Sequence, residues 1–119
     1  MRAIAERQLA GRLRRTSRRQ IQALVDQIVS KFAPRKVILF GSQARGQAGP
    51  DSDVDLLVIT DKPAGPSRAL RIRLAVDCEF ALDLIVCGRA RLEKRLALGD
   101  FFLRDCVREG KVVYERTRA

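Results

Sequence analysis

Several residue types that enzymes often use are missing from this chain of 119 residues. It has no histidine and no tryptophan, and its three cysteines are Cys78, Cys87 and Cys106. Without histidine, Ser-His-Asp and Cys-His catalysis and histidine-ligated zinc are excluded. The cysteines are odd in number and lack C-x-x-C spacing, so neither a disulfide framework nor a thiolate metal site is indicated. Any catalysis must therefore use carboxylates, hydroxyls, cations or bound metal ions.

Long apolar runs are also missing. No segment approaches the length of a membrane span, and the N-terminus is rich in arginine where a signal peptide would need an apolar stretch. We therefore expect a cytoplasmic protein with no membrane association.

Positive charge is in excess, with 24 basic and 14 acidic residues and a formal net charge of +10. Residues 1–20 contain seven arginines and a single acid, Glu6. Such a surface attracts phosphate-bearing ligands, which include nucleoside triphosphates, nucleic acids and acidic proteins. Aromatic residues make up only 5% of the chain, so platforms for stacking single-stranded bases are scarce. We divide the chain into a basic N-terminal segment, residues 1–16, and one domain, residues 17–119.

Alternating strand and helix patterns predict an α/β (α+β) fold, in which a small mixed β-sheet is flanked by helices. Thr16-Ser17 followed by Gln20 resembles a capping box and predicts a helix that ends before Pro34. Later helices are predicted over residues 67–76, 89–98 and 100–109, the last capped by Asp100. The predicted strands cover residues 36–40, 54–60, 82–87 and 112–114.

Two carboxylates stand two residues apart at the start of the second predicted strand. On a strand, Asp53 and Asp55 project from the same face and repel each other. A hard divalent cation relieves that repulsion, and oxygen atoms are its natural ligands. This spacing therefore predicts a metal site.

The turn after the first predicted strand has the features of a phosphate site. Gly41 allows close approach of a phosphate to the backbone, and the Ser42 hydroxyl can donate a hydrogen bond to it. Arg45, one helical turn later, either pairs with a phosphate oxygen or braces the acidic loop.

A third carboxylate would complete a metal site, and Asp83 is the candidate. It lies in the middle of an apolar strand, where an unpaired charge is costly, and metal coordination would explain its presence. Alternation of apolar residues favours Asp83, while Asp77 or Glu79 would replace it if the strand were misplaced.

Together these residues resemble a known family. The pattern G-S-x-A-R-G, followed after five residues by S-D-x-D-L-x-V and later by a lone Asp in an apolar strand, resembles the minimal nucleotidyltransferases of the polymerase-beta superfamily. The resemblance covers roughly residues 20–115 of the chain.

The resemblance implies that Gly41 and Ser42 hold the β- and γ-phosphates of a nucleoside triphosphate. It implies two Mg²⁺ ions on Asp53 and Asp55, with Asp83 binding the catalytic ion and helping to activate the acceptor hydroxyl. The implied reaction moves AMP from ATP to that hydroxyl and releases pyrophosphate. Larger family members carry a helical acceptor domain that this chain lacks, so the acceptor surface would belong to another chain.

Minimal members of this family are often encoded with a small helical HEPN-type toxin, which they modify and silence, so the resemblance implies an antitoxin role. Two other functions stay open at this point. One is a catalytically inactive module that neutralises a partner by contact alone, and the other is a basic nucleic-acid-binding domain. The sequence also leaves the nucleotide, the acceptor and any homo-oligomer undecided.

Overall fold

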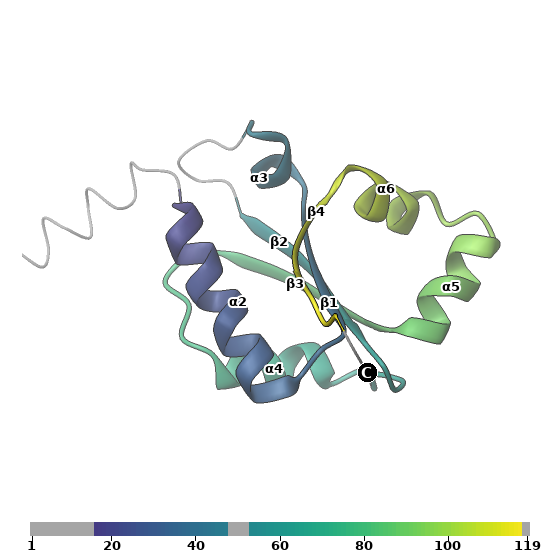
Figure 1. Cartoon of the computed structure of the whole chain (residues 1–119), viewed down its shortest axis with the longest axis horizontal. Coiled ribbons are helices and arrows are strands. Elements are labelled where there is room, and N and C mark those ends of the chain that lie inside the picture. The colour runs from purple at the N-terminus through teal and green to yellow at the C-terminus, as the bar shows by residue number, and fades with distance from the viewer. Residues whose placement is uncertain (1–15, 48–52, 118–119) are drawn as a thin grey trace, which may run out of the picture.

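The computed structural model describes residues 16–47 and 53–117 and arranges them as one sheet between two layers of helices (Figure 1). The predicted basic segment, residues 1–16, lies outside the described residues except for Thr16. The elements in chain order are α2 (Arg18–Phe32), β1 (Lys36–Phe40), α3 (Ser42–Arg45), β2 (Val54–Thr60), α4 (Arg68–Ala75), β3 (Leu82–Gly88), α5 (Arg89–Ala97), α6 (Phe101–Glu109) and β4 (Lys111–Glu115). The predicted α/β fold with a small sheet flanked by helices is confirmed.

The four strands follow the order β3-β2-β1-β4 across the sheet. β1 pairs antiparallel with β2 and with β4, whereas β2 and β3 are parallel. The parallel pair is joined by α4, as a crossover between parallel strands requires. The sheet is therefore mixed, as the sequence predicts.

Each face of the sheet packs against its own pair of helices. On one face, α2 and α4 cover a core that includes Leu24, Ile28, Leu56 and Ile72. On the other face, α5 and α6 cover a second core that includes Ile38, Leu57 and Cys106. Both cores are largely aliphatic, which agrees with the low aromatic content of the chain.

The helix boundaries follow local capping signals. The Ser17 side chain accepts a hydrogen bond from the Gln20 N–H, and the Gln20 side chain accepts one from the Ser17 N–H, so the predicted capping box is present. Spacing alone does not identify the buried side of α4, because Leu70 and Leu74 are exposed and Ile72 is fully buried. The two leucines stand four residues apart, but the helix turns Ile72 toward the sheet.

The predicted cap of α6 is also confirmed. Asp100 accepts a hydrogen bond of 3.0 Å from the Leu103 N–H and two from the Arg95 guanidinium at 3.1 and 2.9 Å. The Leu103 N–H, followed by Arg95, lowers the pKa of Asp100 below its ordinary value. Because α6 forms one wall of the site described below, this cap also supports the site.

We expect the Asp100→Ala variant to melt a few degrees below the wild type at neutral pH, because it removes the cap and the ion pair. A lowered pKa in the folded state gives stability above the unfolded-state pKa and loses it as the pH falls. The difference in melting temperature should therefore shrink below pH ~3.9, the ordinary aspartate value. Thermal unfolding followed by circular dichroism from pH 7 to pH 2.5 measures this. Asp100→Asn keeps a cap acceptor but no charge, so its melting temperature should lie between those of the wild type and Asp100→Ala. A difference between the wild type and Asp100→Ala that stays constant at every pH would contradict the role given to the Asp100 charge.

Within the described part of the chain, no helix has the length and apolar character needed to cross a membrane. Cys87 and Cys106 are buried and Cys78 is partly buried, and all three are free thiols. Burial is the main cause that raises the pKa of the Cys106 thiol to about 11. The three cysteines therefore lie in or against the two cores.

Candidate active site

The turn between β1 and α3 brings the backbone against an acidic side chain. Gly41 has a φ of 77°, in the left-handed region, and a Cβ added there would overlap the Asp55 Oδ2 atom. An L-residue is therefore excluded twice, by its backbone conformation and by the neighbouring carboxylate. Gly41 was predicted as a phosphate-approach residue, and the structure adds that it makes room for Asp55.

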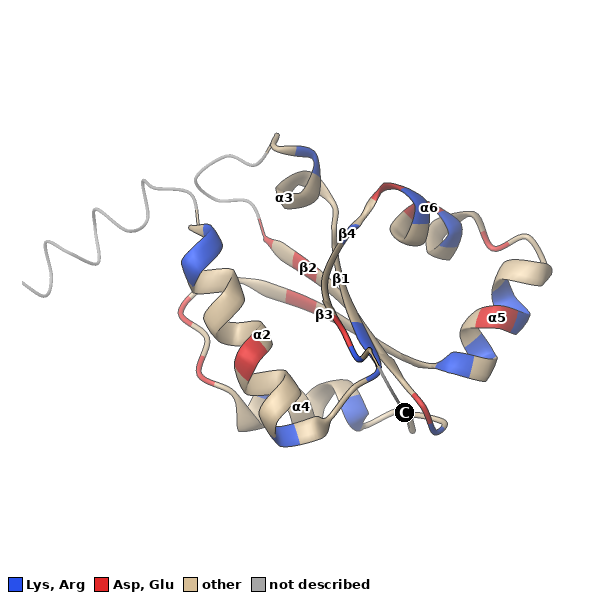
Figure 2. Cartoon of the chain, viewed as in Figure 1, with Lys and Arg blue, Asp and Glu red and all other residues tan. Residues whose placement is uncertain are grey.

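Asp55 and Asp83 lie directly beside each other on neighbouring strands. In the parallel register of β2 and β3 they are paired residues, so their side chains share one face of the sheet. Asp53 immediately precedes β2 and is exposed. Figure 2 shows the acidic positions of β2 and β3 at neighbouring places on the sheet. The structure thus pairs Asp55 with Asp83, and Asp53 lies close enough for its charge to act on Asp55.

Electrostatics show that these carboxylates are crowded. Partial burial raises the pKa of Asp55, and the negative charges of Asp83 and Asp53 raise it further. The positive charge of Arg45 acts in the opposite direction. Asp55 is therefore in a position where an added cation would be stabilising.

One part of the sequence argument for Asp83 is wrong. Asp83 is the second residue of β3, not the middle of the strand, and it is exposed. Its carboxylate therefore needs no metal to offset burial. The register with Asp55 is the stronger reason to select it, since Asp77 and Glu79 precede the strand and the Asp77 N–H donates to Gln27 in α2.

Arg45 ends the short helix α3 and is exposed. Its Nε donates a 3.2 Å hydrogen bond to the Gln47 side chain. It also lines a hollow together with Gly41. Arg45 therefore lies near both the glycine turn and Asp55, which suits either role expected from the sequence.

The chemistry of the three carboxylates is that of ligands for a divalent cation. All three offer hard oxygen donors, and the negative charges of Asp83 and Asp53 act on Asp55. Among the described residues, however, no group of three or more His, Cys, Asp or Glu side chains is drawn together tightly enough to hold a metal ion. Asp55 and Asp83 form the adjacent pair, and Asp53 lies at the edge of the strand. The chemistry of their donor atoms therefore fits a divalent cation, with Asp55 and Asp83 as the adjacent pair.

A hollow of about 270 Å³ adjoins the glycine turn on the face covered by α6. Its walls include Gly41 and Arg45 on one side and Phe102, Asp105 and Glu109 of α6 on the other. Sequence reasoning did not assign the α6 residues to the site. The available signal was the Phe101-Phe102 pair at the start of an amphipathic helix, where one ring must face away from the core.

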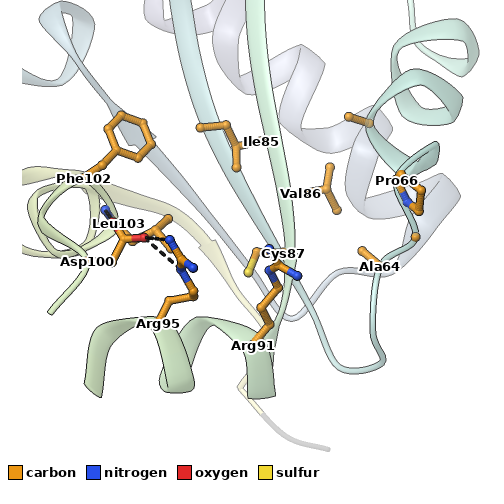
Figure 3. Close-up of a pocket in the computed structure, with 12 residues that line it drawn as sticks. Ala64, Pro66, Ile85, Val86, Cys87, Arg91, Arg95, Asp100, Phe102 and Leu103 are labelled. Carbon is orange, nitrogen blue, oxygen red and sulfur yellow. Dashed lines mark hydrogen bonds and ion pairs between the residues drawn. The ribbon is translucent and has the colours of Figure 1, made fainter. Parts of the chain in front are cut away.

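A second and larger hollow, of about 470 Å³, runs along β3 between α5 and α6 (Figure 3). Ile85 and Cys87 of β3 form its floor, and Phe102 closes one side. Arg91 and Arg95 project from α5, and Arg95 pairs with Asp100. Phe102 therefore lines both hollows.

Asp61 belongs to a different part of the molecule. It follows β2 at the end opposite Asp55 and pairs with Arg35, Arg89 and Arg116. These contacts tie the strand ends and α5 together, so the role of Asp61 is structural.

A family model described as the nucleotidyltransferase domain matches residues 21–109. The chain belongs to this nucleotidyltransferase family. The matched range contains the glycine turn, the three carboxylates and the whole of α6, so the family expected from the sequence is confirmed and the chain is a nucleotidyltransferase.

Individual relatives agree with the family. A proposed protein adenylyltransferase of Methanocaldococcus jannaschii is 31% identical over 96 residues, which cover 79% of this chain and 94% of that protein. A crystal structure of a proposed nucleotidyltransferase from Sulfolobus solfataricus aligns with a TM-score of 0.59 at 19% identity, over 97% of this chain and 89% of that one. A chain from a crystal structure of a toxin-antitoxin with AMP-PNP aligns with the same TM-score and identity, over 81% of this chain and 74% of that one. At this identity the two structures support the fold.

Proposed function

We propose that this nucleotidyltransferase moves AMP from ATP to a hydroxyl group on a partner protein, with Mg²⁺ held by Asp53, Asp55 and Asp83. The observation that carries the proposal is the position of Asp55, which lies against the glycine turn and beside Asp83. A phosphate held at Gly41 would therefore be next to the crowded carboxylates. Metal-assisted nucleotidyl transfer requires a phosphate next to metal-binding carboxylates in this way.

In this proposal the turn residues hold the triphosphate. The backbone at Gly41 and the hydroxyl of Ser42 bind the β- and γ-phosphates, and the Arg45 guanidinium pairs with a phosphate oxygen. Arg45 already lies in the field of Asp55 and lines the hollow at Gly41. Its charge would keep the triphosphate close to the acids.

The reaction needs little covalent chemistry from the protein. The acceptor oxygen forms a bond to the α-phosphorus, the bond from that phosphorus to the β-phosphate oxygen breaks, and pyrophosphate leaves with the electron pair. The hydroxyl proton passes to Asp83, which is exposed and can release it to solvent. When two Mg²⁺ ions are bound, they neutralise charge on the phosphate oxygens and on the leaving pyrophosphate. The protein supplies position and charge, which explains how a chain without histidine can be an enzyme.

The named relatives support a protein as the acceptor. One is described as a proposed protein adenylyltransferase and is matched over nearly its full length, and another comes from a toxin-antitoxin with AMP-PNP. We propose a small helical toxin of the HEPN type as the partner, with this chain as the antitoxin. The free thiols fit a reducing compartment, so we infer that the pair acts in the cytoplasm.

The proposal is tested by incubating the purified chain with Mg²⁺ and ATP labelled on either the α- or the γ-phosphate, with and without the product of the adjacent gene. We expect the α-label to appear on the partner protein and the γ-label to appear only in pyrophosphate. Intact mass measurement should show the partner gaining whole AMP units. Transfer of the γ-label to protein would instead indicate a kinase and would contradict the proposal.

The main competing function is a module that inhibits its partner by contact alone. If the partner is inhibited to the same extent without ATP, and no label reaches any protein with any nucleoside triphosphate, the contact-only function is favoured. If inhibition requires ATP and persists after this chain is removed, covalent modification is favoured.

A further inference from the structure

Two aromatic side chains lie beside the glycine turn, Phe40 of β1 and Phe102 of α6. The whole chain has five phenylalanines, one tyrosine and no tryptophan, and Phe32, Phe80 and Tyr114 pack against the core on the other face of the sheet. Phe40 directly precedes Gly41 and pairs with Asp55 across the sheet. The Phe102 ring meets the Phe40 ring edge to face, with centroids 5.7 Å apart and an interplanar angle of 89°. This contact orients the Phe102 ring next to the site.

Phe102 is nevertheless poorly buried, with 53% of its surface exposed. It lines the hollow that contains Gly41 and Arg45, and it also lines the larger hollow along β3 (Figure 3). A fixed aromatic ring with an open surface, beside a phosphate-binding turn, is suited to stacking against a flat ligand.

The neighbouring ring of Phe101 is a useful contrast. It is 71% exposed, but the Arg104 guanidinium lies over it at 4.8 Å from the ring centroid. Phe101 lines neither of the two hollows. Of the two adjacent rings, only Phe102 is turned to the site.

We propose that the base of the nucleoside triphosphate stacks on the ring of Phe102. This inference rests on the proposed function, which places the triphosphate at Gly41, and it adds the residue that binds the other end of the substrate. Stacking uses the π-face that every base has, so Phe102 contributes affinity for the nucleoside and little choice among bases. A triphosphate without a base would gain nothing from this ring.

The absence of tryptophan makes a direct test available, because Phe102→Trp creates the sole tryptophan of the chain. We expect Mg²⁺–ATP to change the fluorescence of this tryptophan in a saturable way, and Mg²⁺–tripolyphosphate to leave it nearly unchanged. Phe101→Trp is the matched control, one residue away and also exposed, and neither ligand should change its signal.

Affinity provides a second readout that does not depend on catalysis. In equilibrium dialysis, Phe102→Ala should bind ATP about tenfold more weakly and tripolyphosphate equally well. Phe102→Leu keeps an apolar contact with Phe40 but has no π-face, so it should show the same loss. Phe102→Tyr should restore binding.

Three other results would overturn the stacking inference, and they can be told apart. If the wild type binds ATP and Phe102→Trp gives no ligand-dependent signal, Phe102 is not the platform, and the proposed function stands. Equal loss of ATP and tripolyphosphate in Phe102→Ala would mean that the ring only supports the fold. Failure of the wild type to bind ATP at all would overturn both this inference and the proposed function.

Discussion

Replacing Asp55 by Asn is expected to lower the rate of AMP transfer by at least about a hundredfold, because metal ions contribute several kcal/mol to such reactions. The amide has the shape of the carboxylate but lacks its charge and is a poorer ligand for Mg²⁺. Of the three acids, Asp55 is the one that lies both against Gly41 and beside Asp83. Initial rates of α-label transfer to the partner, measured at saturating Mg²⁺, provide the test.

The same substitution should not weaken the fold, which separates this effect from misfolding. Burial and two neighbouring acids raise the pKa of Asp55, so its ionised form is disfavoured in the folded chain. With metal removed by a chelator, the melting temperature of Asp55→Asn at pH 7 should equal or exceed that of the wild type. Asp26→Asn, an exposed carboxylate on α2 with the same change of charge, is the matched control and should transfer AMP at the wild-type rate. Undiminished transfer by Asp55→Asn would show that the site is elsewhere.

The largest expected effect on stability is that of Gly110→Ala, a loss of about 3 kcal/mol in the free energy of unfolding. Gly110 ends α6, and its N–H donates a 3.0 Å hydrogen bond to the Cys106 carbonyl. An added Cβ would overlap that carbonyl and would lie 2.9 Å from the Leu39 carbonyl of β1. These are backbone atoms, so α6 and β1 must separate to admit a single methyl group. Urea denaturation followed by circular dichroism measures the loss.

Gly65→Ala is the control for this prediction. Gly65 lies in the loop before α4, and a Cβ added there meets nothing within 4 Å. Its free energy of unfolding should stay within about 0.5 kcal/mol of the wild type. If Gly110→Ala were as stable as Gly65→Ala, the close approach of Gly110 to the backbone of α6 and β1 would be contradicted.

Short-range patterns predicted most of the secondary structure. β1 and β2 have the predicted bounds, and α2 and α6 begin at the predicted Ser17 and Asp100 caps. Such signals act over a few residues, since a cap satisfies the free N–H groups of its own first turn. Burial within α4 was not predictable in this way, because it depends on how the helix is rotated against the sheet. Ile72 is buried there while Leu70 and Leu74 are exposed.

The sequence by itself determined the chemistry of the candidate site: a glycine turn and carboxylates two residues apart, in a chain with no histidine. It also indicated the family, because the motif is continuous along the chain. Only the tertiary structure placed Asp83 beside Asp55, since that pairing depends on the parallel register of β2 and β3. It likewise decided that α6 closes the site and turns Phe102 toward it. Residue types and local spacing are properties of the chain, whereas strand partners and helix orientation follow from burying both faces of the sheet at once.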